Sequence, residues 1–158
     1  MKIKRFEEFT YIILVNASQV AYHEEAPVTH SLLSSFNEVY RYIIKKEDKV
    51  LLEDEISILK KYFNVQKIRY GNKFSVLINE NLSDKAIYIN HLSVIDFVDY
   101  VFNDTLGRCE GSIGFNITFY LEEAVAMDIE AQMDGKSSIV SKVLQDKEDI
   151  CVQIDDCG

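Results

Sequence analysis

The stretch that decides the fold is Leu52-Glu53-Asp54-Glu55-Ile56, followed by Tyr62-Phe63-Asn64-Val65-Gln66-Lys67-Ile68-Arg69-Tyr70-Gly71. Its three acidic residues at 53–55 are typical of the first turn of a helix, where the helix dipole favours negative charge. Ile56, Leu59 and Phe63 then follow at helical spacing, and Gly71 is the usual left-handed residue after a helix end. This stretch therefore predicts one helix from about Glu53 to Tyr70.

The composition indicates an ordinary folded domain, or a small domain with a helical annex. The chain has 158 residues, 47% of them hydrophobic, with nine Phe and nine Tyr to fill a core. A net charge of −9 argues against nucleic-acid binding, which requires a basic face. The three cysteines, Cys109, Cys151 and Cys157, are odd in number and lack C-x-x-C spacing. They predict reduced thiols rather than a disulfide framework or a zinc site, so we expect no metal.

No segment of the sequence is typical of a membrane anchor or a leader peptide. The apolar run Tyr11–Val15 is far shorter than the roughly 20 residues that a spanning helix needs. The basic residues Lys2, Lys4 and Arg5 are not followed by a small-residue cleavage site. We therefore expect a cytoplasmic chain without membrane contact of its own, so that any membrane region of the full-length protein would lie outside it.

The N-terminal residues predict a helical hairpin. A first helix covers Phe6 to about Tyr22, and the segment Glu24–Pro27 breaks it because proline lacks an amide donor and restricts its predecessor. Thr29 is the expected cap of a second helix that runs to Ile44. This helix carries a broad apolar stripe of Leu32, Leu33, Phe36, Val39, Tyr40, Ile43 and Ile44. Such a stripe packs either on the rest of the domain or on a second copy of the chain.

The C-terminal residues predict further helices and a sheet. In chain order we expect a strand at Lys73–Asn79, a helix at Leu92–Phe102, two antiparallel strands at Ser112–Tyr120 and Ala124–Gln132, a short helix at Ser137–Leu144, and a final strand at Asp149–Ile154. Helices on one face of a mostly antiparallel sheet make an α+β fold. The expected division is a helical hairpin over residues 1–50 and an α/β sandwich over residues 51–158.

The opening stretch resembles the L-E-E-E-L…Y-L-E-I-Q-K-L-R-F-G segment of the LytS/YehU-type sensor histidine kinases. Phe36–Tyr42 is similar to the L-S-D-L-L-R-Y of that family, Ile89–Tyr100 falls without a gap on I-P-P-L-L-L-Q-P-L-V-E-N, and Gly111–Phe115 falls on a strand that begins G-x-I-x-I. The resemblance covers about Phe6 to Gln153. It implies a dimerising hairpin followed by a GHKL (Bergerat-type) ATPase sandwich, in a protein of two-component signal transduction.

The resemblance places no histidine at the phosphoacceptor position. The family motif is N-P-H-F-L-F-N-T-L-N-S-I; Asn16-Ala17 falls on its N-S and Phe9 falls on its histidine. A phenyl ring has no nitrogen, so no phosphoramidate can form there. His23-Glu24, with Pro27 following, resembles the H-E-x-x-x-P box of the larger histidine-kinase class, but the proline comes one residue early. We interpret His23 as an exposed loop residue, and His30 and His91 are no better placed.

The nucleotide-binding motifs are also altered where the resemblance places them. In the N box, Asp99 falls on the acid and Tyr100 on the asparagine that binds magnesium, and a phenol is a poor ligand for that hard cation. Asn103 and Asp104 lie one turn further and could either face the same cleft or end the helix.

The adenine-binding D-x-G-x-G motif falls on Met133-Asp134-Gly135-Lys136-Ser137, with methionine at the aspartate. Asp134 would serve only if the strand slipped by one residue, so a turn at Asp134-Gly135 is the favoured interpretation. The glycine-rich G-L-G-L lid of the family is absent.

We therefore interpret the chain as a degenerate member of that family, a pseudokinase with a regulatory or scaffolding role. The expected partners are a second copy, a genuine kinase or a response regulator, and no cofactor is expected. One alternative is an active kinase that binds ATP and magnesium through Asp99, Asn103 and Asp134 in shifted roles. Another is a small-ligand sensor that reuses the vacated cleft, with Tyr100 and Asp134 as its polar groups. The chain would then be a cytoplasmic protein or the soluble part of a membrane-anchored sensor.

Overall fold

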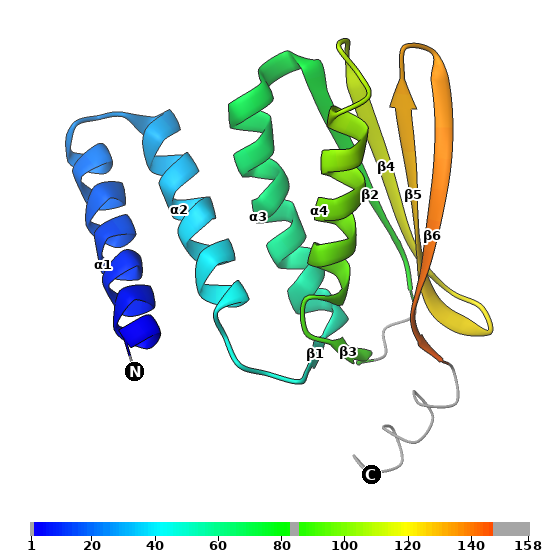
Figure 1. Ribbon diagram of the computed structural model, residues 1–158, viewed down its shortest axis with the longest axis horizontal. Helices are drawn as coiled ribbons and strands as arrows, with labels where there is room; N and C mark the ends of the chain where they lie inside the picture. The colour runs from blue at the N-terminus through cyan, green and yellow to red at the C-terminus, as the bar shows by residue number, and fades with distance from the viewer. Residues whose placement is uncertain (1, 83–85, 147–158) are drawn as a thin grey trace. The chain divides into compact units, whose positions relative to one another are not determined.

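A computed structural model describes residues 2–82 and 86–146 and confirms the α+β class (Figure 1). The elements, in chain order, are α1 (Lys2–His23), α2 (Pro27–Ile43), β1 (Lys49–Leu51), α3 (Leu52–Tyr70), a 3-10 turn (Gly71–Lys73), β2 (Phe74–Asn81), β3 (Tyr88–Asn90), α4 (Ser93–Leu106), β4 (Ile113–Leu121), β5 (Ala124–Met133) and β6 (Lys136–Asp146). The chain forms two compact units: a helical unit of residues 1–46 and 57–71, and a sheet unit of residues 47–56 and 72–158. None of the helices within the described residues is long and apolar enough to cross a membrane.

The helical unit contains the predicted hairpin, with α1 and α2 running antiparallel (Figure 1). The prediction that Thr29 caps α2 is wrong, because the helix already begins at Pro27 and Ala26 occupies the cap position without a side-chain hydrogen bond. Proline is favoured at the first helical position, since its fixed φ suits a helix and its missing amide hydrogen would have no helical partner there. The two helices are joined by the Tyr40 hydroxyl, which donates to the carbonyl oxygen of Glu7 at 3.4 Å.

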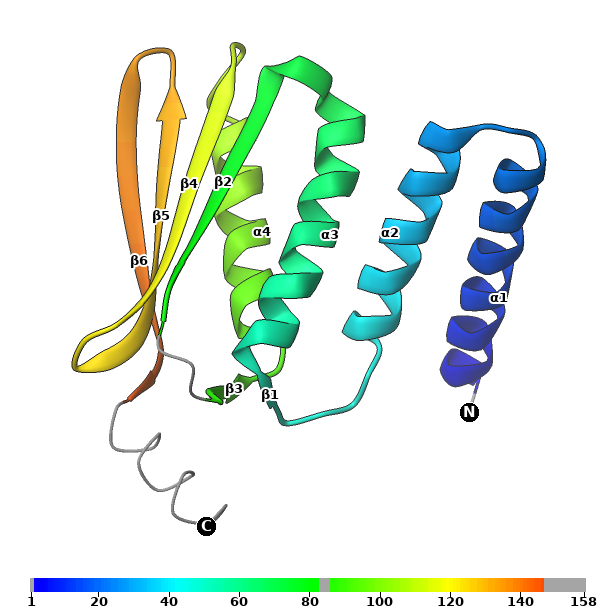
Figure 2. The same cartoon turned by 180° about the vertical axis from the view of Figure 1, so that it is seen from behind.

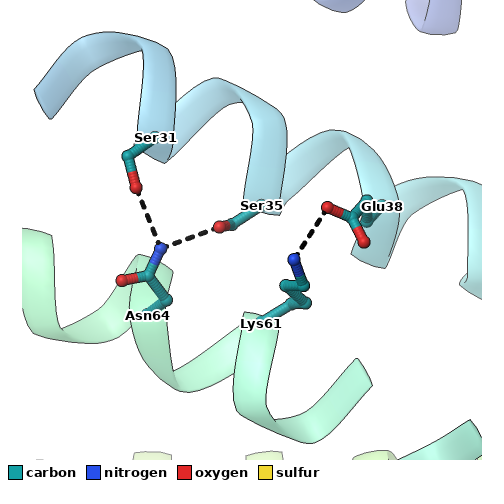
Figure 3. A network of polar contacts seen from close by, with 5 residues as sticks. All are labelled: Ser31, Ser35, Glu38, Lys61 and Asn64. Carbon is teal, nitrogen blue, oxygen red and sulfur yellow. Dashed lines mark hydrogen bonds and ion pairs between the residues drawn. The ribbon is translucent and has the colours of Figure 1, made fainter. Parts of the chain in front are cut away.

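Helix α3 spans the predicted segment, with acidic residues in its first turn and Gly71 directly after its end at a φ of +61°. Its residues 57–70 belong to the helical unit and contact α2 through polar side chains, as Figure 3 shows. The Asn64 amide donates to Ser31 Oγ at 3.2 Å and to Ser35 Oγ at 2.8 Å. Lys61 forms an ion pair with Glu38, with 3.0 Å between Nζ and Oε1. This side of α2 therefore packs through hydrogen bonds.

The sheet unit is built on a four-stranded mixed sheet in the order β2-β4-β5-β6. The predicted antiparallel pairing of β4 and β5 is confirmed, β6 is antiparallel to β5, and β2 is parallel to β4. Alternate residues of the strands form a buried inner face, on which α4 packs (Figure 2). On this face the ring of Phe102 from α4 lies 5.4 Å from that of Phe74 and 5.6 Å from that of Phe115.

The prediction of a short helix at Ser137–Leu144 is wrong, because these residues lie in β6. Their apolar positions 139, 140, 143 and 144 suit a helix as well as a strand, and the β-branched residues Ile139, Val140 and Val143 favour the strand. The turn at 134–135 folds the chain back so that Lys136 pairs with Met133, and the pairing continues to Asp146 opposite Ala124. The expected strand at Asp149–Ile154 lies outside the described residues.

A second, two-stranded sheet was not predicted. It pairs β1 with β3 in antiparallel register, with Val50 opposite Ile89, and both of these side chains are buried. Strands of three residues are too short to show an alternating pattern in the sequence. The pair brings the chain that enters α3 next to the chain that enters α4.

Candidate functional site

Helix α4 carries the residues that the resemblance assigns to magnesium binding. Its buried face consists of Val94, Ile95, Val98, Val101, Phe102 and Thr105. Tyr100 lies off this face with 68% of its surface exposed, while Asp99 is half-buried. The Asn103 amide donates to the carbonyl oxygen of Asp99 at 2.9 Å, and Asp104 pairs with Arg108 at 2.8 Å. The polar groups of Asn103 and Asp104 are therefore engaged locally, on the last turns of the helix.

The start of α4 is held by Glu55, a residue that the sequence identified only as part of an acidic helix start. Its side chain is fully buried within the sheet unit. One carboxylate oxygen accepts a hydrogen bond from the backbone N–H of Val94 at 2.8 Å, and the other accepts from that of Leu92. Leu92 has a φ of +66° and caps α4 without a side-chain hydrogen bond of its own. Glu55 supplies the missing cap, and its position between the buried residues Leu52 and Ile56 was the available signal.

The residues assigned to adenine binding lie at the turn between β5 and β6. Asp134 has a φ of +48° and Gly135 a φ of +78°, so both central residues are left-handed, as in the two-residue turns of tight hairpins. This confirms the favoured interpretation of Asp134-Gly135 as a turn. The Asp134 carboxylate accepts a weak hydrogen bond from Cys109 Sγ at 3.6 Å. The Asp134 carboxylate also lies against Gly111, so a side chain at position 111 would collide with this carboxylate in its present position.

A cavity of about 610 Å³ opens beside this turn. It is lined mainly by polar residues of the sheet unit, among them Lys73, Ser75, Gln132 and the segment 133–137. Within the described part of the chain, no α4 residue lines this cavity. The turn that contains Asp134 therefore contributes to this cavity without Asp99, Tyr100 or Asn103 of α4.

The outer face of the sheet carries pairs of polar side chains that form hydrogen bonds with each other. Asn79 donates to Asn116 across β2 and β4 at 2.7 Å, and the Tyr120 hydroxyl donates to Asp128 at 3.1 Å. Partial burial, together with the hydrogen bond to the Asp128 carboxylate, raises the pKa of Tyr120 above the ordinary value of a phenol.

The phosphoacceptor position of the resemblance lies on α1. Phe9 is 60% exposed there, so its ring is a surface feature of the helix and not part of a core. His23 is the last residue of α1 and is exposed. The backbone N–H of His91 donates to the carbonyl oxygen of Asp48.

His30 is half-buried, and its Nδ1 lies 2.9 Å from the carbonyl oxygen of Ser18 and 3.1 Å from Ser18 Oγ. Because a carbonyl only accepts, Nδ1 carries the hydrogen, and His30 ties α2 to α1. His23 and His30 both line a cavity of about 610 Å³ at the tip of the hairpin, with Tyr22 and Glu25. Among the described residues, no group of three histidine, cysteine or acidic side chains could hold a metal ion.

In a comparison with known protein families, residues 7–74 match the family described as Histidine kinase. The matched part runs from α1 to the first residue of β2, so it includes Phe9 and the Asn64 contacts and ends before α4. No curated protein matches the chain. The match supports a histidine kinase-type family and a signalling module related to it, and it covers less than half of the chain.

Proposed function

We propose that this chain is a module of a LytS/YehU-type sensor histidine kinase that has kept the helical frame and lost the phosphotransfer chemistry. It would act as a pseudokinase with a regulatory or scaffolding role in two-component signalling. The observation that carries the proposal is Phe9, which lies within the family-matched residues and is 60% exposed on α1. The position is accessible, as a phosphoacceptor must be, but the phenyl ring offers no nucleophilic nitrogen.

The C-terminal part supports the loss of nucleotide binding by a GHKL-type domain. Tyr100 stands where such a domain has its magnesium-binding asparagine, and Met133 stands where it has its adenine-binding aspartate. Residues 136–146, which would follow as the glycine-rich lid, form the paired strand β6. A strand held in register by β5 cannot close over a nucleotide as a loop can.

The helical hairpin supports an assembly of two chains. The predicted stripe of α2 is divided: Val39 is buried, while Phe36 is 43% and Ile43 is 45% exposed. Further exposed apolar side chains lie on α1 and at the start of α2, namely Phe9, Ile12, Ile13, Val20 and Val28. Apolar side chains repeated along two helices are typical of a surface that packs against another protein. We propose a homodimer, or a heterodimer with a genuine kinase, and a response regulator as a further partner.

The alternatives receive less support from the geometry. An active kinase in shifted roles needs Asp99, Asn103 and Asp134 around one nucleotide, and a ligand sensor needs Tyr100 and Asp134 in one pocket. The cavity beside Asp134 is lined by none of the α4 residues that the structure describes. It is also mainly polar, whereas small-ligand pockets are mostly apolar.

Incubation with radiolabelled ATP and magnesium, followed by gel separation under alkaline conditions that preserve phosphohistidine, tests the proposal. We expect no label on the purified chain. An excess of an unlabelled, non-hydrolysable ATP analogue is the control that would suppress any label that depends on nucleotide binding. If label appears and is lost on substitution of one histidine, for example His23→Ala, the chain is an active kinase and the proposal is wrong. The same assay with a genuine kinase of this family shows that the conditions support phosphorylation.

A further inference from the structure

A second cavity lies in the helical unit, between α2 and α3, and belongs to none of the sites above. Its volume is about 410 Å³, and we refer to it as the α2–α3 cavity. Ser31, Ser34 and Ser35 line it from α2, and Lys60, Lys61 and Asn64 line it from α3, with His30 at one end. It lies within the family-matched residues, yet nothing in the resemblance assigns it a role.

The lining of the α2–α3 cavity consists of hydrogen-bond donors. Three serine hydroxyls and two ammonium groups supply these donors, whereas the Nδ1–H of His30 and both amide hydrogens of Asn64 already donate within the helical unit. Among the described residues, no aspartate or glutamate lines the cavity. The chain as a whole has 26 acidic residues against 17 basic ones, so a cavity lined by two lysines and no carboxylate differs in charge from the chain as a whole. This chemistry complements a ligand that only accepts hydrogen bonds.

Asn64 organises these donors, as Figure 3 shows. Its amide group lies between the two serine hydroxyls and donates to Ser31 Oγ at 3.2 Å and to Ser35 Oγ at 2.8 Å. Because both hydroxyl oxygens accept from Asn64, their own hydrogens can be directed to another acceptor. Ser35 is only 5% exposed, so its hydroxyl is fixed by the packing of the two helices.

The cationic side of the cavity is also held in place. Lys61 pairs with Glu38 at 3.0 Å, and each of these two side chains keeps about two-fifths of its surface exposed. The pair holds the Lys61 ammonium at the rim of the cavity. Lys60, the neighbouring lysine of α3, adds a second ammonium group to the lining.

We propose that the α2–α3 cavity binds a tetrahedral oxyanion of the phosphate class, either free phosphate or the phosphoryl group of a small molecule. Such a group presents at least three acceptor oxygens in different directions, which matches serine hydroxyls on one helix and ammonium groups on the other. A carboxylate has only two acceptor oxygens, which lie in one plane, so it matches donors from two helices less well. The proposal does not depend on the loss of phosphotransfer chemistry, since none of these residues belongs to the nucleotide motifs.

Nuclear magnetic resonance titration of the ¹⁵N-labelled chain with inorganic phosphate tests this site. With chloride at matched ionic strength as reference, we expect saturable shifts confined to amides near Ser31, Ser34, Ser35, Lys60 and Asn64, at phosphate concentrations of about 1–10 mM. Lys60→Gln should weaken binding at least about fivefold, because it removes one charge-assisted contact. Lys67→Gln, which removes the same charge from an exposed position of the same helix outside the cavity, should leave the dissociation constant within about twofold.

A parallel titration with O-phospho-L-serine separates the two sources of the oxyanion. Tighter binding of phosphoserine than of inorganic phosphate identifies a phosphoryl group on a larger molecule, and the reverse order identifies the free ion. Circular dichroism of each variant checks that it folds, and Ser34→Ala provides a second, uncharged perturbation that should also weaken binding. The proposal is overturned if phosphate causes no shifts beyond those of chloride, if the shifts lie elsewhere, or if Lys67→Gln weakens binding as much as Lys60→Gln.

Discussion

Removal of the Glu55 carboxylate should destabilise the sheet unit strongly, although Glu55 lies far from any motif of the nucleotide site in the sequence. Glu55 is fully buried, and its two oxygens accept the backbone N–H groups of Leu92 and Val94. In Glu55→Ala both donors lose their partner, and each unsatisfied buried donor costs about 1–3 kcal/mol. We expect the free energy of unfolding to fall by about 3–5 kcal/mol, a large part of the 5–15 kcal/mol typical of a domain.

Two further variants separate the hydrogen bonds from the charge. Glu55→Gln keeps one acceptor oxygen and should cost about half as much as the alanine variant, roughly 1.5–2.5 kcal/mol. Glu53→Ala removes an exposed acid from the same helical turn and should stay within about 0.5 kcal/mol of the unmodified chain. Urea denaturation followed by circular dichroism gives the three values. A loss below about 1 kcal/mol for Glu55→Ala, or one equal to that of Glu53→Ala, would refute the assignment of Glu55 as the cap of α4.

Two other predictions follow from exposed positions of the structure. Ile13→Asp, on the exposed apolar surface of α1, should raise the dissociation constant of a hairpin dimer at least about tenfold, since a buried Ile side chain is worth about 1.5–3 kcal/mol. Ile139→Asp, at a 65% exposed position of β6, is its control, and sedimentation velocity that finds only monomer for the unmodified chain contradicts the dimer. Gly135→Ala should cost about 1–2 kcal/mol in thermal or urea unfolding because Gly135 has a φ of +78°. Gly107→Ala, at a φ of −67°, should cost less than about 0.5 kcal/mol, and equal losses would argue against the left-handed turn.

Local signals in the sequence were sufficient for the helices. Helix α3 has an acidic first turn, apolar residues at helical spacing and a terminal glycine, and the structure places it within one residue of the prediction. Pro27 predicts the break between the two helices of the hairpin. It does not predict where α2 begins, because a threonine at the cap position and a proline at the first helical position each indicate a helix start. The structure has the start at Pro27 and not at Thr29. Boundaries depend on single residues in this way, whereas the existence of a helix depends on many.

Non-local contacts account for what the sequence did not predict. The spacing of Ile139, Val140 and Val143 fits a helix or a strand, and pairing with β5 decides the outcome. The role of Glu55 depends on Leu92, which is distant in sequence and adopts a positive φ that is rare for leucine.

The candidate site shows the same limit. Its residues could be assigned by resemblance. That the cavity beside Asp134 is lined by none of the described α4 residues follows only from the three-dimensional arrangement. The α2–α3 cavity likewise requires residues about 30 positions apart to meet, as Asn64 does with Ser35.

The central claim is that the fold of a sensor kinase module has been kept without its nucleotide chemistry, and calorimetric titration with ATP and magnesium tests it most directly. The account predicts no binding tighter than a dissociation constant of about 1 mM, equivalent to about −4.1 kcal/mol. The reasons are Tyr100 and Met133, which stand at the positions that the resemblance assigns to magnesium and adenine binding, and the paired strand β6 where the resemblance places a lid. A magnesium-dependent dissociation constant well below about 1 mM, weakened by Asp99→Asn, would contradict it.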